Sequence, residues 1–293
     1  NPSNLSNYSN YSNPSNLLQL KMPLLQVLIV AFGAKGIESI ARLPHPQVEG
    51  VEYIVSWQYA DDAPVVPESL LKRKDFRILP TPTRGVAHNR NLALDAATAP
   101  IVLESDDDVF YTEEQLLSVI RAFDEHPEAD YINFRYHSDD NPIPRFDAEF
   151  DMRRPPRGWY IGGAFEMAFR LQPIRRRQIR FNELFGIGAE FPAGEEDLFI
   201  NDVLRAGLKA IHLPITIVTH PGTTTSMRME RADSFIRTKG AVFTYLHPLS
   251  WPLRMLAHAR RFSTSPREIA RYIRAWMRGA RDIRKFRSDF TKK

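Results

Sequence analysis

Cysteine is absent from the sequence, which excludes both a disulfide framework and a thiolate metal site. Any bound metal must therefore use oxygen or imidazole ligands. Long apolar runs are also missing, because none approaches the roughly 18 residues of a membrane-spanning helix. The N-terminus lacks the basic and then apolar order of a signal peptide. These absences indicate a reducing compartment, and we expect a cytoplasmic protein.

The N-terminal segment lacks the composition of a folded chain. Ser-Asn recurs at positions 3–4, 6–7, 9–10, 12–13 and 15–16, with only Pro, Leu or Tyr between the pairs. Such a low-complexity sequence cannot bury enough surface to offset its chain entropy, so we expect residues 1–21 to be a disordered leader. The chain has 293 residues, of which 43% are hydrophobic, so the remainder suffices for one large or two small globular domains.

The net charge of +4 is distributed unevenly. Residues 251–293 contain 13 Lys and Arg against 3 Asp and Glu, whereas residues 1–250 contain 26 against 32. An acidic body therefore carries a strongly basic tail. This asymmetry suggests an anionic partner for the tail, either a membrane surface or a nucleic acid.

From Leu24 onward, short apolar runs alternate with helical patterns, which is typical of a mostly parallel α/β sheet with helices on both faces. Thr112 and Gln115 are spaced as a capping box at the start of a helix. A long antiparallel strand over 160–171 and a Gly- and Phe-rich loop over 181–194 break the alternation. The predicted strands are 24–31, 51–57, 76–79, 101–103, 131–136 and 209–218, and further helices are predicted over 36–42, 68–74, 86–97 and from 195 to the glycine at 207.

Three adjacent carboxylates, Asp106, Asp107 and Asp108, follow directly after the apolar run 101–103. Open α/β sheets bind ligands at the carboxyl ends of their strands. Because adjacent carboxylates repel one another, a divalent cation is a natural partner for them. The alternative is a solvated acidic turn, since Asp is common in turns and at helix N-caps.

Two further groups follow later in the chain. Glu195, Glu196 and Asp197 stand at a predicted helix start after Gly194, where acids also suit the helix dipole without any function. His220 comes just after the last predicted strand and before Pro-Gly, a position from which it could reach a ligand. Taken alone, such a residue is more often a loop histidine that caps a neighbouring group.

The series formed by 84–94, the triplet at 106–108, Phe-Asn-Glu at 181–183 and Gly-Glu-Glu-Asp at 194–197 resembles glycosyltransferase family 2 over roughly 24–225. The resemblance implies a GT-A fold and transfer of a sugar from a nucleotide-diphosphate sugar. It also implies that Asp106 and Asp108 form an Asp-x-Asp element that holds Mg²⁺ or Mn²⁺ on the diphosphate.

Individual roles follow from the same resemblance. Asp108 is expected to bind the metal directly, Asp106 to reach the ribose or a metal-bound water, and Asp107 to face the nucleotide site or the protein interior. His220, 24 residues after Glu196, is expected to complete the metal shell, which would favour Mn²⁺. Glu196 is expected to be the general base of an inverting enzyme, with Asp197 as the alternative.

On the donor side, the resemblance implies that Ala31 and Phe32 flank the base and that Arg84 and Arg90 meet the phosphates. For Arg90, a helix-surface position is the alternative. The family's usual Asp after the second strand is replaced by Ser-Trp-Gln at 56–58, so the identity of the base stays open.

On the acceptor side, aromatic faces can stack on sugar rings, and a glycine-containing turn at 186–188 could close over the acceptor. We expect Trp159, Tyr160, Phe185 and Glu195 to line this side. Ordinary core packing is the alternative for the aromatic residues.

The tail shows a basic amphipathic helix, with apolar residues at three- and four-residue spacing from Ile269 to Phe286. It could dock on the body with its charged face outward. It could also bind anionic lipid reversibly, with Trp276 and Phe286 at the interface.

We therefore expect a GT-A catalytic domain over 22–228, with a nucleotide-binding half at 22–137 and an acceptor half at 138–228, followed by a helical basic region at 229–293. The expected activity is metal-dependent inverting glycosyl transfer to a glycan or glycolipid hydroxyl in surface polysaccharide synthesis, without a nucleic-acid partner. One alternative is a sugar-1-phosphate nucleotidyltransferase, although Gly-Ala-Lys-Gly at 33–36 is a weak phosphate loop. Another is a nucleic-acid or anionic-surface binding protein that uses the tail.

Overall fold

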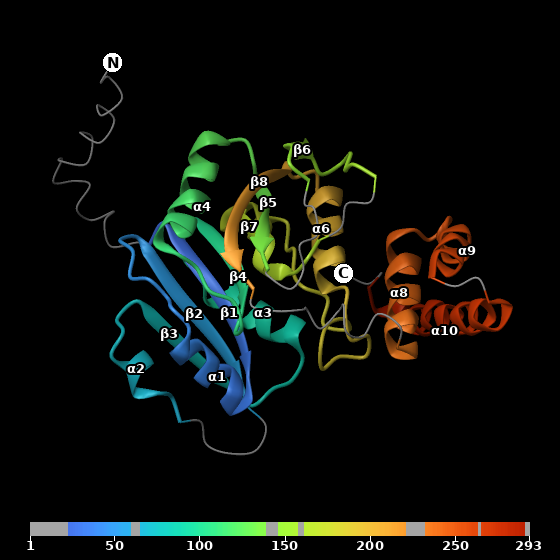
Figure 1. Ribbon diagram of the computed structural model, residues 1–293, viewed down its shortest axis with the longest axis horizontal. Coiled ribbons are helices and arrows are strands. Elements are labelled where there is room, and N and C mark those ends of the chain that lie inside the picture. The colour runs from blue at the N-terminus through green and yellow to red at the C-terminus, as the bar shows by residue number, and fades with distance from the viewer. Residues whose placement is uncertain are drawn as a thin grey trace.

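A computed structural model describes residues 23–59, 65–138, 146–157, 161–220, 232–262 and 265–290. Within them, the strands form one mixed sheet in the order β3-β2-β1-β4-β7-β5-β8-β6 (Figure 1). The predicted α/β class is confirmed. The strands are β1 (Leu25–Phe32), β2 (Val51–Gln58), β3 (Phe76–Thr81), β4 (Ile101–Asp106), β5 (Tyr131–His137), β6 (Phe150–Asp151), β7 (Met167–Arg170) and β8 (Ala210–Thr219).

Helices cover both faces of the sheet, as the alternation of the sequence predicts. On β1, Val27 and Ile29 pack in one apolar cluster with residues of α1 and α4, whereas Leu28 packs in another with residues of α3, α5 and α6. Strands buried on both faces need apolar residues at consecutive positions, which explains their continuous hydrophobic runs. The helices of this part are α1 (Gly33–Arg42), α2 (Glu68–Leu71), α3 (Val86–Ala96), α4 (Glu113–Glu125), α5 (Leu171–Arg176) and α6 (Glu195–Arg205).

The strand order reverses between β1 and β4. From β1 the chain continues to β2 and β3 on one side, and then returns to place β4 on the other side of β1, in parallel. The carboxyl ends of β1 and β4 therefore lie side by side at a topological switch point, where open α/β sheets bind ligands.

The predicted antiparallel strand over 160–171 is too long. The structure contains only the four-residue β7, antiparallel to both β4 and β5, after a 3₁₀ turn at Ala164–Glu166. The carboxylate of Glu166 accepts a hydrogen bond from the backbone N–H of Gly162 at 2.6 Å, which folds this segment back on itself. Directly after β7 the chain enters α5, so the apolar pattern runs through three elements.

The helix start at Thr112 is confirmed. Its side chain accepts a hydrogen bond from the backbone N–H of Gln115 at 3.2 Å, and the Gln115 side chain accepts one from the Thr112 backbone N–H at 2.8 Å. This capping box fixes the direction in which the chain enters α4 after the acidic triplet.

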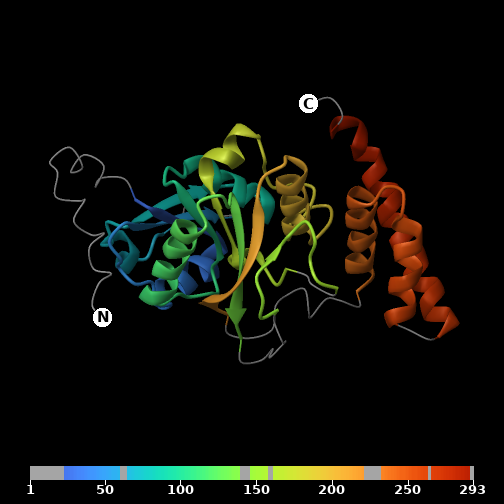
Figure 2. The same ribbon diagram turned by 90° about the horizontal axis from the view of Figure 1, so that it is seen from above.

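Three helices after β8 pack beside the sheet: α8 (Asp233–Leu246), α9 (Trp251–Phe262) and α10 (Pro266–Phe290). Both views place α8 between α6 and α10 (Figures 1 and 2). The apolar face of the tail helix is buried here, and Trp276 is fully buried against α8 and α9. The expectation that Trp276 lies at a lipid interface is therefore wrong, because α8 already covers it.

Glycines allow α8 and α10 to approach closely. A Cβ on Gly240 would collide with the carbonyl of Trp276, and one on Gly279 would collide with the carbonyl of Arg237. Arg237 of α8 forms ion pairs with Glu190, which lies in the loop before α6, and with Asp282 of α10, the latter at 2.8 Å. None of the helices described is long and apolar enough to cross a membrane.

Candidate functional site

The predicted donor side lies where β1 and β4 end. Asp106 is paired in register with Val30 of β1, so the triplet emerges next to Ala31 and Phe32. Phe32 is 51% exposed, whereas the Ala31 side chain is buried and its carbonyl accepts a hydrogen bond from Asn89 at 3.2 Å. Of these two neighbours of the triplet, only Phe32 offers its side chain to a ligand.

Asp107 points toward the protein. Its carboxylate lies against Gly36 of α1, where a Cβ would collide with it. Burial raises its pKa to about 7, with further contributions from Asp106 and Asp108, while the backbone of Phe32 opposes the shift. The inward orientation is one of the two expected for this residue.

Arg90 of α3 is 2% exposed and fixes the base of the site. Its guanidinium contacts Asp106 at 2.7 Å and Glu104 at 3.3 Å, and it lies 5.8 Å from the centre of the Phe181 ring. Burial alone would lower the pKa of Arg90. The charges of Asp106 and Glu104 outweigh this effect, so the pKa is raised overall. Both the expected phosphate contact and the helix-surface alternative require an accessible Arg90 side chain. In the structure this side chain is buried and contacts the carboxylates of Glu104 and Asp106 from the protein interior.

Asp108 and His220 meet although 112 positions separate them in the sequence. The segment after the triplet pairs with the end of β8 through two hydrogen bonds between Phe110 and Thr219, at 3.2 and 3.1 Å. This pairing brings Nε2 of His220 to 3.5 Å from Oδ2 of Asp108. The Asp108 side chain is 56% exposed and that of His220 is 7% exposed, so only the carboxylate faces solvent widely.

The residues present fit a divalent cation that takes most of its ligands from substrate and water. Among the described residues, no group of three or more His, Asp or Glu side chains is arranged to hold a metal. One Asp106 oxygen is already paired with Arg90, whereas Asp108 and His220 bring an oxygen and a nitrogen donor within 3.5 Å of each other. Protein sites for Mg²⁺ often provide only one or two ligands and leave the others to phosphate and water.

The acids at the start of α6 face different surroundings. Burial raises the pKa of Glu196. The positive charge of Arg90 opposes this shift, whereas the negative charge of Asp106 adds to it. The pKa of Asp197 is raised to about 7 by loss of water and by Glu196, with Lys239 of α8 opposing the shift, although Asp197 is exposed, so that solvent weakens these effects. Glu196 therefore belongs to the charge cluster around Arg90, whereas Asp197 lies toward α8.

Glu195 is only 5% exposed and is the most deeply buried of these acids. Burial raises its pKa well above the usual range, and the neighbouring Glu196 adds to the shift. A Cβ on Gly186 would lie about 3 Å from its carboxyl group. Glu195 thus faces the protein, and the expected contact with an acceptor does not agree with this placement.

The other predicted acceptor residues do not form a surface in the described chain. Phe185 is fully buried and stacks on Phe191 at 4.9 Å between ring centres, in a cluster with α8 and α10, so its expected role in acceptor stacking is wrong. Trp159 and Tyr160 lie outside the described residues. Ile187 of the neighbouring turn is 57% exposed.

Two features of the site were missed from the sequence. Glu104 is fully buried within β4, and burial raises its pKa to about 7 despite Arg90. An acid inside an apolar strand run needs a buried partner, and this signal was available. The second feature is Asn89, which bonds the Ser56 hydroxyl at 2.5 Å, the Ser56 carbonyl at 2.9 Å and the Ala31 carbonyl. It ties the ends of β1 and β2 together.

Arg84, the other predicted phosphate ligand, is exposed just before the first residue of α3. The Gln58 side chain holds this loop by donating hydrogen bonds to the Thr83 hydroxyl at 3.0 Å and to the Gly85 carbonyl at 3.2 Å. The loop that carries Arg84 is therefore anchored to the carboxyl end of β2, on the same edge of the sheet as the triplet.

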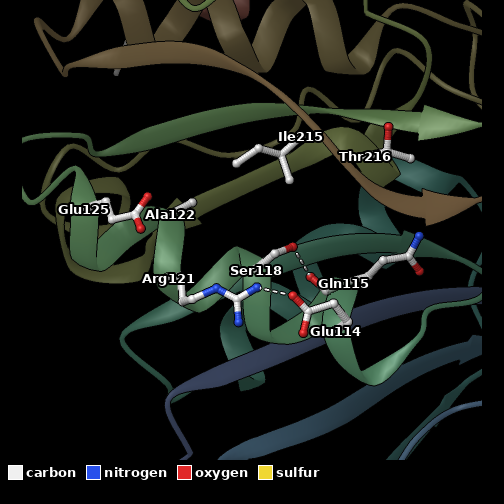
Figure 3. A pocket seen from close by; sticks show the side chains of 8 residues that line it. All are labelled: Glu114, Gln115, Ser118, Arg121, Ala122, Glu125, Ile215 and Thr216. Atoms are coloured by element: carbon white, nitrogen blue, oxygen red, sulfur yellow. Dashed lines mark hydrogen bonds and ion pairs between the residues drawn. The ribbon is translucent and has the colours of Figure 1, made fainter. Parts of the chain in front are cut away.

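One surface cavity lies away from these residues, and another borders the predicted motif at 181–183. One of about 320 Å³ is formed by α4 and β8 and contains the Glu114–Arg121 ion pair (Figure 3). A larger one of about 670 Å³ is bordered by Arg177, Arg205 and Tyr245, among others. Neither is lined by the triplet, by His220 or by the acids at positions 195–197, although the larger cavity includes Phe181, Glu183 and Asp202.

Comparisons with known proteins agree on one family. Solved structures similar to this chain include residues 1–349 of TarS from S. aureus (TM-score 0.56, 16% identity, 87% of this chain and 80% of that one). The mannosyltransferase PcManGT from Pyrobaculum calidifontis with GDP-Man and Mn²⁺ is also similar (TM-score 0.52, 17% identity, 87% and 74%). These likenesses support the GT-A fold. No curated protein matches the sequence. The family model described as "Glycosyl transferase family 2" matches residues 37–191, which is more than half of the chain, and the protein therefore belongs to that glycosyltransferase family.

Proposed function

We propose that the protein transfers a sugar from a nucleotide-diphosphate donor to a hydroxyl of a glycan or glycolipid, with inversion and with the help of a divalent cation. The observation that carries the proposal is the position of Arg90. Its guanidinium contacts Asp106 at the end of β4, and its positive charge lowers the pKa of Glu196 at the start of α6, against the effect of burial. Donor-side and acceptor-side acids are thereby linked through one buried cation.

The donor side is supported by the carboxylates at the switch point. Asp108 and His220 would hold Mn²⁺ or Mg²⁺, which when bound neutralises negative charge on the departing diphosphate. Asp106, oriented by Arg90, would face the ribose or a metal-bound water, and Phe32 would flank the base. Relatives of the same fold were solved with UDP-GlcNAc (TarS; TM-score 0.53, 15% identity, 87% of this chain and 81% of that one) and with GDP-Man and Mn²⁺.

Glu196 would serve as the general base that takes the proton from the attacking hydroxyl. A carboxyl with a raised pKa accepts a proton near neutral pH more readily than an ordinary one. Asp197 has a raised pKa as well, but it lies toward Lys239 rather than toward Arg90. Because Arg90 also contacts Asp106 on the donor side, the position near Arg90 favours Glu196 as the base.

The experiment compares Glu196→Gln with Asp197→Asn, two substitutions that remove one charge each and keep the shape. We expect Glu196→Gln to keep donor binding and to lower kcat at least about a hundredfold, because general bases contribute roughly 10²–10⁴-fold. Asp197→Asn should retain most activity. Turnover is measured as release of UDP or GDP from a panel of nucleotide sugars, with calorimetry for binding. Wild-type turnover in Glu196→Gln, or loss confined to Asp197→Asn, would contradict the assignment.

The cation is tested separately through Asp108→Asn, with Asp107→Asn as the matched control because it lies next in the chain but faces α1. In the proposal, Mn²⁺ strengthens binding of UDP or GDP to the wild-type protein, and Asp108→Asn loses that gain while Asp107→Asn keeps it. Identical nucleotide affinities of the wild-type protein with and without Mn²⁺ would refute the metal-dependent donor site.

Synthesis of a surface polysaccharide would place the acceptor on a lipid carrier. The basic region at 251–293 would then bring the enzyme to the membrane, and the residues that could do so differ from those expected from the sequence.

A further inference from the structure

The outer surface of the C-terminal helices carries the most exposed apolar side chains of the described chain apart from Val65. Leu249 is 96% exposed and Leu253 is 74% exposed. Both lie where the turn after α8 enters α9, four positions apart. At these exposures the two leucines bury little apolar surface, so they contribute little to folding.

Exposed arginines of two helices lie near the start of α9. Arg254 is exposed next to Leu253, and the guanidinium of Arg284 lies 5.4 Å from the centre of the Trp251 ring, which places the C-terminal part of α10 beside the start of α9. Exposed Met277 and Arg281 precede Arg284 on one face of α10, at spacings of four and three residues. Arg254 and Arg284 therefore place charge near the start of α9, where the two leucines are found.

The cationic face extends along α10, where the exposed basic residues follow each other at intervals of three or four. Two of them are paired, Arg271 with Asp233 and Lys285 with Asp282. Arg274, Arg278 and Arg281 form no ion pair with any described residue, and they remain available to an external anion.

We propose that this surface, made of Leu249, Leu253 and the exposed arginines of α9 and α10, binds the anionic face of a lipid bilayer. The leucines enter the boundary between head groups and acyl chains, and the arginines contact lipid phosphates. A basic face alone would suit any polyanion. Two leucines that are 96% and 74% exposed near it favour a partner that has an apolar interior.

The proposal adds a place of action to the proposed function but does not depend on it. It also differs from insertion of the tail's apolar face, which α8 covers. Deleting residues 251–293 is a poor test, because it would uncover the buried clusters that contain Ile236 and Val242 of α8. Substitutions at exposed positions leave those clusters intact.

The experiment uses the full chain and vesicle flotation, with vesicles of phosphatidylglycerol and phosphatidylcholine or of phosphatidylcholine alone. Leu249→Ser with Leu253→Ser should weaken binding to anionic vesicles by about tenfold or more, given the apolar area that each leucine buries. Val65→Ser with Leu71→Ser is the matched control, because these side chains are 82% and 67% exposed near α2, on the far side of the sheet (Figure 1). It should bind like wild type.

Charge is tested with Arg278→Glu and Arg281→Glu, which should weaken anionic vesicle binding by at least about tenfold, since each basic residue contributes roughly fivefold. Binding to phosphatidylcholine alone should be weak for every variant. Equal binding to both vesicle types, or an unchanged affinity in the double-serine variant, would overturn the proposal. So would equally tight binding of duplex DNA that the leucine substitutions leave unchanged. Hydrolysis of the soluble donor should be the same in all these variants, so its absence from wild type would count against the proposed function alone.

Discussion

Replacing Arg90 with Met tests whether the buried cation holds the site together. The substitution keeps an apolar stem of similar length but leaves Glu104, which is fully buried, and Asp106, which is 29% exposed, without their partner. Removing one member of a buried ion pair typically costs about 3–5 kcal/mol of unfolding free energy. Because the pKa of Glu104 is already raised to about 7, this carboxyl can take up a proton at neutral pH. We therefore expect the low end, about 3 kcal/mol.

The double variant Arg90→Met with Glu104→Met separates two contributions to this cost. One is the lost attraction of the ion pair, and the other is the cost of leaving Glu104 buried without a partner. Removing both charges replaces the pair with apolar side chains, and such replacements are often neutral or stabilising. Asp106 can regain water, so we expect the double variant to recover all but about 1 kcal/mol of the loss. Nucleotide affinity should stay low in both, because Asp106 loses the contact that orients it.

The measurement is urea denaturation followed by circular dichroism, with linear extrapolation to water. Arg73→Met is the control, because its pair with Asp75 at 2.5 Å is partly exposed and should contribute about 1 kcal/mol or less. If Arg90→Met costs no more than Arg73→Met, or if the double variant is as unstable as the single one, Arg90 does not act by compensating buried acids.

Two further predictions concern stability away from the site. Burial, followed by the charge of Arg73, lowers the pKa of His45 to about 4, so the unfolded chain takes up a proton first as the pH falls below about 6.5 and the native state loses stability down to about pH 4. His45→Phe should make the loss of unfolding free energy between pH 7 and 5 smaller by about 2 kcal/mol, and an unchanged pH profile in urea titrations would contradict this. Gly240→Ala should lower Tm and cost about 1–3 kcal/mol, because α8 and α10 must separate, whereas in an uncrowded helix the same change stabilises by about 1 kcal/mol. A rise in Tm would show that the helices have room.

Much of the first half of the fold could be predicted from the sequence. Continuous apolar runs predicted β1, β2 and β4 to within a few residues, because strands buried on both faces have no polar alternation to obscure them. The helix at Thr112 was predictable because its capping box is a local interaction. The segment 160–171 was not, because its apolar side chains serve a turn, a strand and a helix that only tertiary contacts distinguish.

The site was predictable in its residues but only partly in its geometry. The triplet and the acids at the start of α6 can be found from sequence. The role of Arg90 depends on its contact with Glu104, whose need for a buried partner is visible in the sequence, although the identity of that partner is not. Phe185 was misjudged because an aromatic residue beside glycines fits both a sugar platform and a core. Docking of the tail on the body was one of two alternatives for Trp276, and the sequence could not decide between them, since the periodicity of α10 indicates an apolar face and not what covers it.

The proposed cation site depends on the backbone pairing between Phe110 and Thr219, which joins distant parts of the chain. Asp108 is synthesised in the first half of the chain, but its imidazole partner follows β8, the last of the described strands in the sequence. A nascent or truncated polypeptide that ends before β8 would hold the whole triplet and still lack half of the proposed chelate. Ion and nucleotide uptake would then favour only the completed sheet, and saturating ligand would strengthen the β4–β8 junction against unfolding.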